Sequence, residues 1–109
     1  MSLPHRGDVV SFRGSQHAKG HEQQGRRYAA VVQSDAFSEL GTVLIVPTST
    51  SAQPAIFRPE VTVQGRRTRL LADQLIAVDR SRIGRSVGRL SGPELEDLEL
   101  SISRLLGLF

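Results

Sequence analysis

The sequence predicts a small, mainly β domain with a single C-terminal helix, arranged as a partly open barrel. Three observations predict this fold class. A chain of 109 residues fits one compact domain, which we expect to span residues 1–109. Its apolar residues come in short blocks, separated by segments rich in glycine, proline and polar residues. Only the part of the chain after residue 90 has the period of an amphipathic helix.

The first strand is predicted over Asp8–Arg13, where apolar and polar residues alternate as in a half-buried strand. Gly14–Gly25 follows it and contains three glycines, two histidines and almost no apolar side chain. This composition predicts a long polar loop. A loop of that length in a small domain is typical of a functional segment.

Two buried strands are predicted over Tyr28–Val32 and Thr42–Val46, which are almost wholly apolar and rich in valine. We expect Pro47 to end the second strand, because proline cannot donate a ladder hydrogen bond. The hydroxyl run Thr48–Ser51 follows directly, so four hydroxyl groups are expected at one end of the sheet.

The next segment is predicted to form a β-hairpin. Phe57–Val63 alternates, Gln64–Arg66 has turn chemistry, and Thr68–Gln74 is the second arm. Further short strands are predicted over Leu75–Val78 and Val87–Leu90, on either side of the arginine-rich stretch from residue 80 to residue 89.

The chain is predicted to finish with one helix. Ser91 and Glu94 have the spacing of a capping box, with Pro93 in the first turn, and Gly107 is the expected C-terminal stop. Leucine and isoleucine recur at helical spacing between these ends, forming a stripe that we interpret as core or dimer contact. It is not expected to be a membrane face, since few basic residues flank it.

Charge is unevenly distributed along the chain. Residues 1–90 contain 13 Lys or Arg and 7 Asp or Glu, whereas residues 91–109 contain 1 and 4. All but one of the 14 basic residues are arginine, whose guanidinium matches phosphate geometry. A basic body therefore favours a polyanionic partner such as a nucleic acid, although a merely solvated surface is the alternative.

Several function classes are excluded or disfavoured. The absence of cysteine excludes disulfides and thiolate catalysis and removes the commonest structural zinc ligands. No stretch is long and apolar enough to span a bilayer, and Met1–Asp8 lacks the apolar core of a secretory signal. We therefore expect a cytoplasmic protein. His17 and His21 fall in a loop rather than on a helix, so no metal and no cofactor is expected.

Several motifs in order along the chain resemble one known family. RGDVV opens the series, KGHEQQGRR crosses the loop, and VLIVPTST, LLADQLIAVDRSRIGR and VGRLS follow. The set resembles the MazF/PemK/Kid toxins of type II toxin–antitoxin systems, with the loop string most similar to Kid-type members. The resemblance implies an SH3-like open barrel that forms a homodimer, cleaves single-stranded RNA at specific sequences and is neutralised by a cognate antitoxin.

The resemblance also places candidate site residues. The family's catalytic arginine falls on Arg27, with Arg26 beside it, and its catalytic threonine falls on Ser49. Chemistry agrees, because cleavage by a ribose 2′-OH needs a cation and a hydrogen-bond donor at the phosphate. Further substrate-binding candidates lie in the hydroxyl run and in the hairpin's second arm: Thr48, Thr50, Arg69, Asp73 and Gln74.

The general base is left open between three residues. Glu22 is preferred because the resemblance puts it in the active loop, and Asp73 and His21 are the alternatives. A surface or ion-pair role is the competing interpretation of both carboxylates, and capping of a turn is that of Ser49.

The chain departs from the family pattern at several positions. Ser49 replaces a threonine, Tyr28 a proline, and Leu71 the arginine that some Kid-type toxins carry two residues before the aspartate. The aromatic residue that usually follows the opening motif is also absent. Two other functions stay open for this fold: a CcdB-like gyrase inhibitor and a catalytically silent nucleic-acid-binding module.

Overall fold

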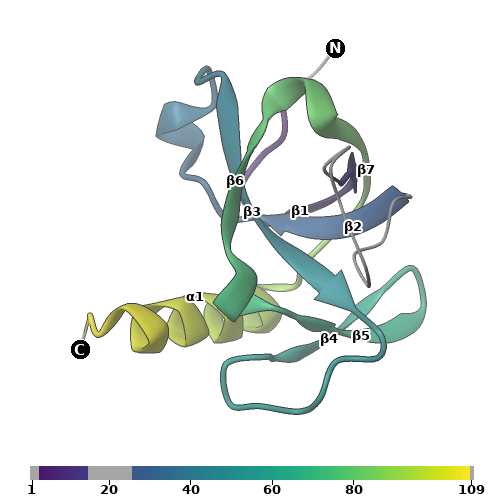
Figure 1. Ribbon diagram of the computed structural model, residues 1–109, viewed down its shortest axis with the longest axis vertical. Coiled ribbons are helices and arrows are strands. Elements are labelled where there is room, and N and C mark those ends of the chain that lie inside the picture. The colour runs from purple at the N-terminus through teal and green to yellow at the C-terminus, as the bar shows by residue number, and fades with distance from the viewer. Residues whose placement is uncertain (1–2, 15–25, 109) are drawn as a thin grey trace.

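A computed structural model describes residues 3–14 and 26–108, and of Arg26 the backbone alone. The described chain is mainly β with one C-terminal helix, which confirms the predicted fold class (Figure 1). The strands are β1 (Asp8–Arg13), β2 (Arg26–Val31), β3 (Thr42–Ser49), β4 (Glu60–Val63), β5 (Arg66–Leu70), β6 (Ile76–Asp79) and β7 (Ile83–Arg89). The helix is α1 (Gly92–Leu106), and 3-10 turns are η1 (Asp35–Phe37), η2 (Ala72–Gln74) and η3 (Arg80–Arg82).

The strands form one antiparallel sheet in the order β4-β5-β3-β2-β1-β7, and β6 pairs with β3 as a branch. Strand β3 has β2 along one edge. Along its other edge it pairs with β6 through Thr42–Ile45 and with β5 through Thr48–Ser49. Because β3 changes partner along its length, the β4–β5 hairpin turns away from β6 and lies beside α1 (Figure 1).

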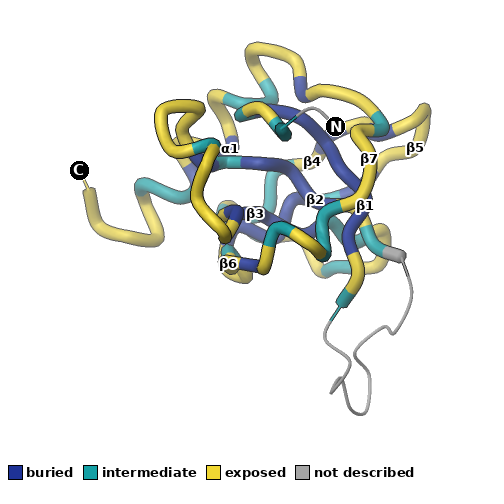
Figure 2. The backbone as a smooth tube through the Cα atoms, turned by 90° about the horizontal axis from the view of Figure 1, so that it is seen from above, coloured by how far each residue is buried: buried dark blue, intermediate teal, exposed yellow. Residues whose placement is uncertain are grey.

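Two hydrophobic clusters cover the two faces of the central strands. Neighbouring residues alternate between them: Val9, Ala30 and Val46 belong to the cluster that includes Leu98 of α1, whereas Val10 and Ala29 belong to the other. Strands β1 to β3 are consequently dark along much of their length in Figure 2. Burial on both faces explains why β2 and β3 are continuous apolar runs in the sequence. Strand β1, predicted to be half-buried, is also buried on both faces, because Ser11 is covered as well as its apolar neighbours.

The predicted hairpin and helix ends are confirmed. Gln64 and Gly65 have φ of 51° and 77°, which is the left-handed pair that a two-residue type I′ turn requires. The Ser91 hydroxyl accepts from the Glu94 N–H while the Glu94 carboxylate accepts from the Ser91 N–H, so the capping box is complete. Gly107 ends the helix with a φ of 68°.

Four sequence-based boundaries are wrong by three residues or more. The first hairpin arm begins at Glu60 rather than Phe57. Pro47 does not end β3, because its carbonyl accepts from Leu71 N (2.8 Å) in the gap between the β6 and β5 ladders, where no ladder donor is lost. The second hairpin arm ends at Leu70 and continues as η2. Strand β7 begins at Ile83 rather than Val87, because pairing with β1 supplies the order that its sequence lacks.

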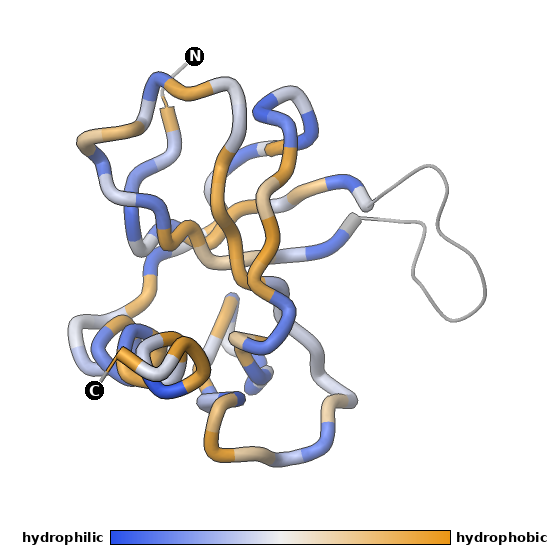
Figure 3. Tube along the Cα trace, turned by 60° about the vertical axis from the view of Figure 1, so that its left-hand side comes forward, coloured by the Kyte–Doolittle hydropathy of each residue, from blue (hydrophilic) through white to orange (hydrophobic). Residues whose placement is uncertain are grey.

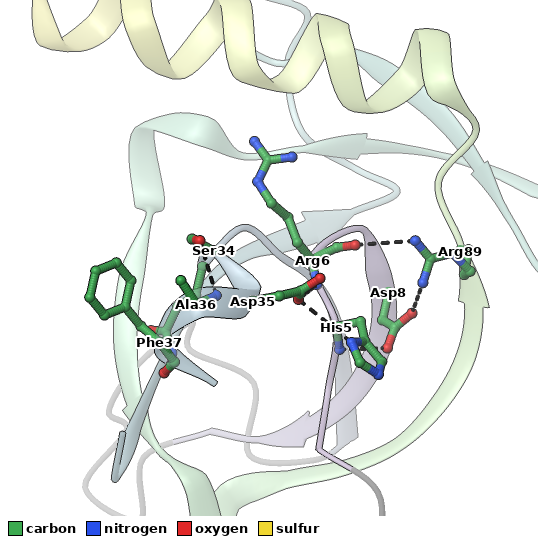
Figure 4. A network of polar contacts seen from close by, with 9 residues as sticks. His5, Arg6, Asp8, Ser34, Asp35, Ala36, Phe37 and Arg89 are labelled. Carbon is green, nitrogen blue, oxygen red and sulfur yellow. Dashed lines mark hydrogen bonds and ion pairs between the residues drawn. The ribbon is translucent and has the colours of Figure 1, made fainter. Parts of the chain in front are cut away.

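A network of polar contacts fixes the start of β1 (Figure 4). The buried Asp8 carboxylate accepts from Arg89 Nη1 (2.6 Å) and from the His5 backbone N–H (2.8 Å). The Arg6 backbone N–H donates to Asp35 Oδ1 (2.8 Å). These bonds join the N-terminal segment to β7 and to η1, and so hold β1 in register between β2 and β7.

The other end of β1 and the beginning of β2 are basic. Arg13 pairs with Arg26 and Phe12 with Arg27 in the β1–β2 ladder. The strand ends that flank the grey trace are accordingly hydrophilic in Figure 3, while the middle of the strands is hydrophobic. Within residues 3–14 and 26–108, no helix has the length and apolarity needed to cross a membrane.

We predict that Gly84→Ala destabilises the fold. An added Cβ would overlap Ser11 Oγ and lie 3.2 Å from the Ser11 carbonyl oxygen, and Ser11 is buried. Overpacking of this kind costs about 1–3 kcal/mol, which urea unfolding would measure. Gly88→Ala in the same strand is the matched control, because nothing lies within 4 Å of its Cβ position. Equal stabilities of the two variants would contradict the packing described.

Candidate functional site

The hydroxyl run predicted at a sheet end lies on the last residues of β3 and just beyond them. Ser49 pairs directly with Arg69 of β5, and Thr48 pairs with Leu70. Residues directly opposite each other on antiparallel strands point to the same face. Ser49 and Arg69 are therefore neighbours on one face, while Leu70 faces the core cluster that contains Leu98.

Arg27 reaches the same face from β2. The β2–β3 ladder runs Val31–Ile45, Ala30–Val46 and Ala29–Pro47. Arg27 precedes Ala29 by two residues and Ser49 follows Pro47 by two, and side chains two apart on a strand share a face. The Thr48 hydroxyl donates to the Tyr28 carbonyl (3.1 Å), which ties the strands together one step beyond the ladder. Side chains of Arg27, Ser49 and Arg69 thus lie on one face of three neighbouring strands.

Phe12 supports the Arg27 side chain. The two residues are paired across β1 and β2, and the guanidinium carbon lies 5.7 Å from the centroid of the buried Phe12 ring. A cation over an aromatic face gains about 0.5–1 kcal/mol when partly exposed. The ring therefore restricts the guanidinium to this face without using any of its N–H donors.

Ser49 has a hydroxyl proton to offer an anion. Its Oγ accepts from the Ser51 backbone N–H (3.3 Å) and lies 3.4 Å from Ser51 Oγ. This is the turn-capping contact considered from the sequence. A serine oxygen that accepts one bond can still donate its own proton, either to Ser51 Oγ at 3.4 Å or, when Ser51 is the donor of that contact, to a bound anion. Thr48 has its proton engaged by Tyr28, while Thr50 is exposed.

Asp73 forms a bidentate ion pair. Its Oδ1 accepts from Arg58 Nε (3.1 Å) and its Oδ2 from Arg58 Nη2 (2.9 Å). These hydrogen bonds hold the pKa of Asp73 below its usual range and raise the pKa of Arg58. A carboxylate with both oxygens occupied and a depressed pKa is a weak proton acceptor. Gln74, the next residue, is exposed at the end of η2.

Some predicted site residues lie outside the described structure. These are His21, Glu22 and the side chain of Arg26, and the first two are candidate bases. Among residues 3–14 and 26–108 there is no group of three His, Asp or Glu side chains that could hold a metal ion.

Two residues of the site have no obvious signal in the sequence. Phe12 alternates inward as a core residue would, and its place under Arg27 depends on the register in which β1 and β2 pair. Arg58 lies in an irregular segment, and its partner Asp73 is 15 residues away. The register that the Gln64–Gly65 turn sets pairs Glu60 with Arg69. The β4–β5 ladder ends at that pair, so its register does not place Arg58.

Comparison with known proteins gives one consistent result. Residues 5–106 match the family described as PemK-like, MazF-like toxin of type II toxin–antitoxin system. A protein of Mycobacterium tuberculosis, named as a candidate toxin, is 45% identical over 91 residues, which are 83% of this chain and 85% of that protein.

Solved structures agree with that match. A MazE–MazF crystal structure from Deinococcus radiodurans superimposes with a TM-score of 0.84 at 26% identity, covering 100% of both chains. An endoribonuclease solved with its cognate antitoxin, from a mycobacterial species, has a TM-score of 0.79 at 17% identity over 97% of both chains, and shows the fold alone.

We predict that the Arg58–Asp73 pair stabilises the fold in a pH-dependent way. Because the pKa of Asp73 is lowered by folding, its contribution is complete above the unfolded pKa, about 4, and is lost as pH falls through the folded pKa. The melting temperature of Asp73→Asn should therefore lie below that of the unaltered protein at pH 7 and converge with it below about pH 4. Glu96→Gln is the control, since this exposed residue has no ion pair within the described residues. A difference between Asp73→Asn and the unaltered protein that does not change with pH would contradict the assignment.

Proposed function

Because the chain belongs to the family of PemK-like, MazF-like toxins of type II toxin–antitoxin systems, we propose that it is a metal-independent endoribonuclease acting on single-stranded RNA. The observation that carries the proposal is the common face of Arg27, Ser49 and Arg69 on β2, β3 and β5. Two guanidiniums and a hydroxyl donor together match the charge and geometry of one phosphodiester. We further propose that residues 1–109 form a single toxin domain.

The proposed reaction is a transesterification. The ribose 2′-oxygen attacks the adjacent phosphorus, the bond from phosphorus to the 5′-oxygen breaks, and the products carry a 2′,3′-cyclic phosphate and a 5′-hydroxyl. Arg27 stabilises the negative charge that develops on the non-bridging oxygens, and Ser49 donates a hydrogen bond to one of them. Arg69, beside Ser49, is the second cation. Such preorganised donors act most strongly in the transition state, where the charge is largest.

Proton transfer requires a base for the 2′-hydroxyl and an acid for the 5′-oxygen. We assign the base to Glu22, with His21 as the alternative. Asp73 is the poorer choice because both its oxygens accept from Arg58, which also lowers its pKa. The surplus of arginine over carboxylate before residue 90 supplies the attraction for the RNA backbone.

Base contacts are expected to involve aromatic side chains near the site. Tyr28 follows Arg27 on β2 and is 36% exposed, and its backbone carbonyl already receives Thr48. Exposed rings can stack on unpaired bases, which is how single-stranded RNA is usually held. Because successive side chains of a strand point to opposite faces, the Tyr28 ring lies on the face of β2 opposite Arg27, and it would stack only on a base that passes around the strand end. Phe57, in the loop beyond Ser49, is the second candidate.

We also propose an antitoxin partner and a homodimer. The D. radiodurans structure contains MazE together with MazF, the mycobacterial endoribonuclease is solved with its cognate antitoxin, and a basic face would attract an acidic antitoxin segment as it attracts RNA. Large apolar side chains remain exposed on and beyond the second half of α1, namely Leu100, Leu105, Leu106 and Leu108. Exposed apolar side chains gathered on one element are typical of an interface.

Cleavage of a single-stranded RNA in EDTA tests the proposal. The purified chain should cut it and leave cyclic phosphate and 5′-hydroxyl ends, identified by end mapping. Arg27→Ala should slow cleavage on the order of a hundredfold or more, because it removes the main charge stabiliser. Ser49→Ala should also slow it, whereas Ser49→Thr, which keeps the hydroxyl, should remain active. Arg85→Ala is the control for lost positive charge, since Arg85 is exposed on β7, three strands from β3 in the sheet.

Three outcomes would argue against this proposal. Intact RNA together with trapped gyrase–DNA complexes would favour a CcdB-like inhibitor. Intact RNA that is merely retarded in a gel would favour a silent binding module. Loss of cleavage on adding EDTA would reject the metal-independent mechanism and leave the family assignment unchanged.

Light scattering tests the dimer separately. At micromolar concentration the chain should have about twice its monomer mass of 11.9 kDa. The backbone amides of the exposed leucines of α1 should become protected from hydrogen exchange as the protein concentration rises through the dissociation constant of the dimer. A monomer at that concentration would contradict the proposed two-chain assembly.

A further inference from the structure

Arg58 is the most heavily engaged side chain near the candidate site. Besides its two bonds to Asp73, its Nη1 donates to the Gln53 carbonyl (3.3 Å), and its backbone N–H donates to the Ala55 carbonyl (2.9 Å). The guanidinium carbon also lies 5.5 Å from the centroid of the Phe57 ring. One residue therefore closes the segment from residue 50 to residue 58 on itself and attaches it to η2.

The same residue contacts the Arg69 side chain. Arg69 Nη1 donates to the Arg58 carbonyl (3.0 Å), and Arg69 is the residue paired with Ser49. On its other side, Arg69 Nη2 lies 3.9 Å from Glu60 Oε1. The Arg69 guanidinium is thus held between a backbone carbonyl and a carboxylate. If the carbonyl moves away, the carboxylate is left to attract the cation alone.

We propose that Arg58 is a positioning residue for RNA cleavage: its ion pair with Asp73 fixes residues 50–58 so that the Arg58 carbonyl keeps the Arg69 guanidinium beside Ser49. This inference rests on the proposed function, and it assigns Asp73 the role of anchor rather than of proton acceptor. Arg58 itself does not touch the RNA.

The geometry favours an anchoring role over direct contact with substrate. Each of the three guanidinium nitrogens of Arg58 already donates to a protein acceptor. The side chains of Arg58 and Asp73 are 22% and 26% exposed, so the pair lies at the surface and is partly screened by its neighbours. A bidentate guanidinium–carboxylate pair fixes both distance and orientation, which is what the attachment of a loop requires.

The cation that pairs with Asp73 comes from residues 50–58, because residues 71–74 contain no cation of their own. Between Leu70 and Leu75 there is no Lys or Arg, and Leu71 is buried, 4% exposed. Arg58, in the connection between β3 and β4, supplies the positive charge that pairs with Asp73. The β3 hydroxyl end and the β5–η2 turn are thereby coupled through one side chain.

The test compares Arg58→Ala, Asp73→Asn and the double variant in cleavage of one single-stranded RNA oligonucleotide, with kcat and KM measured separately. Each single change should lower kcat about tenfold or more with a smaller change in KM, because misplacing a catalytic group by about 1 Å costs up to a hundredfold. Since both act through one pair, the double variant should lose no more than the larger single loss. Arg66→Ala, an exposed arginine at the start of β5, is the matched control.

Two further readouts separate positioning from chemistry. The acidic limb of the pH–rate profile should be unchanged in Asp73→Asn, because the base lies elsewhere. Hydrogen exchange of amides 50–58 should accelerate in both single variants while that of β1 and β2 does not, which shows local release in a folded protein.

Three results would overturn the inference while the unaltered protein still cleaves RNA. These are an undiminished kcat in Arg58→Ala, losses that multiply in the double variant, and an Asp73→Asn variant that loses the acidic limb. If the unaltered protein leaves RNA intact, the proposed function itself fails, and the role of Arg58 in cleavage fails with it.

Discussion

Strand β3 is paired along both edges, and it changes partner once along its length. Its first half lies beside β6 and its second half beside β5, with β2 along the opposite edge. The change occurs at Val46–Pro47, where the missing proline N–H costs no ladder bond and the carbonyl is taken by Leu71. This arrangement brings Ser49 between one strand that carries Arg27 and another that carries Arg69. The placement of the site thus depends on where β3 exchanges β6 for β5.

The three arginines around the end of β3 have different partners. Arg58 is neutralised by Asp73, and Arg69 is shared between Glu60 and a carbonyl. Within the described part of the chain, Arg27 has no ion pair and rests on the Phe12 ring. A cation held by an aromatic face keeps its hydrogen-bond donors for an anion. The site therefore combines one cation that is open to substrate with others whose positions are fixed by the protein.

Sequence reasoning succeeded where local chemistry decides the structure. The Gln64–Gly65 turn and the Ser91 and Gly107 helix ends follow from residues a few positions apart. It failed where a distant partner decides: Pro47 is tolerated because of ladders elsewhere, and β7 is ordered by β1 rather than by its own residues. Arg27 and Ser49 were identified by resemblance, and their common face required the register. The role of Arg58 needed the three-dimensional contacts with Asp73 and Arg69.

The central claim is that Arg27 and Ser49 meet at one phosphate. A crystal structure with a single-stranded oligonucleotide that carries 2′-deoxyribose at the cleaved position tests it most directly, because that sugar lacks the attacking oxygen. We predict a single phosphate whose non-bridging oxygens lie about 3 Å from an Arg27 guanidinium nitrogen and from Ser49 Oγ. A bound oligonucleotide whose phosphates contact neither side chain, or contact them at sites on different surfaces, would contradict the account.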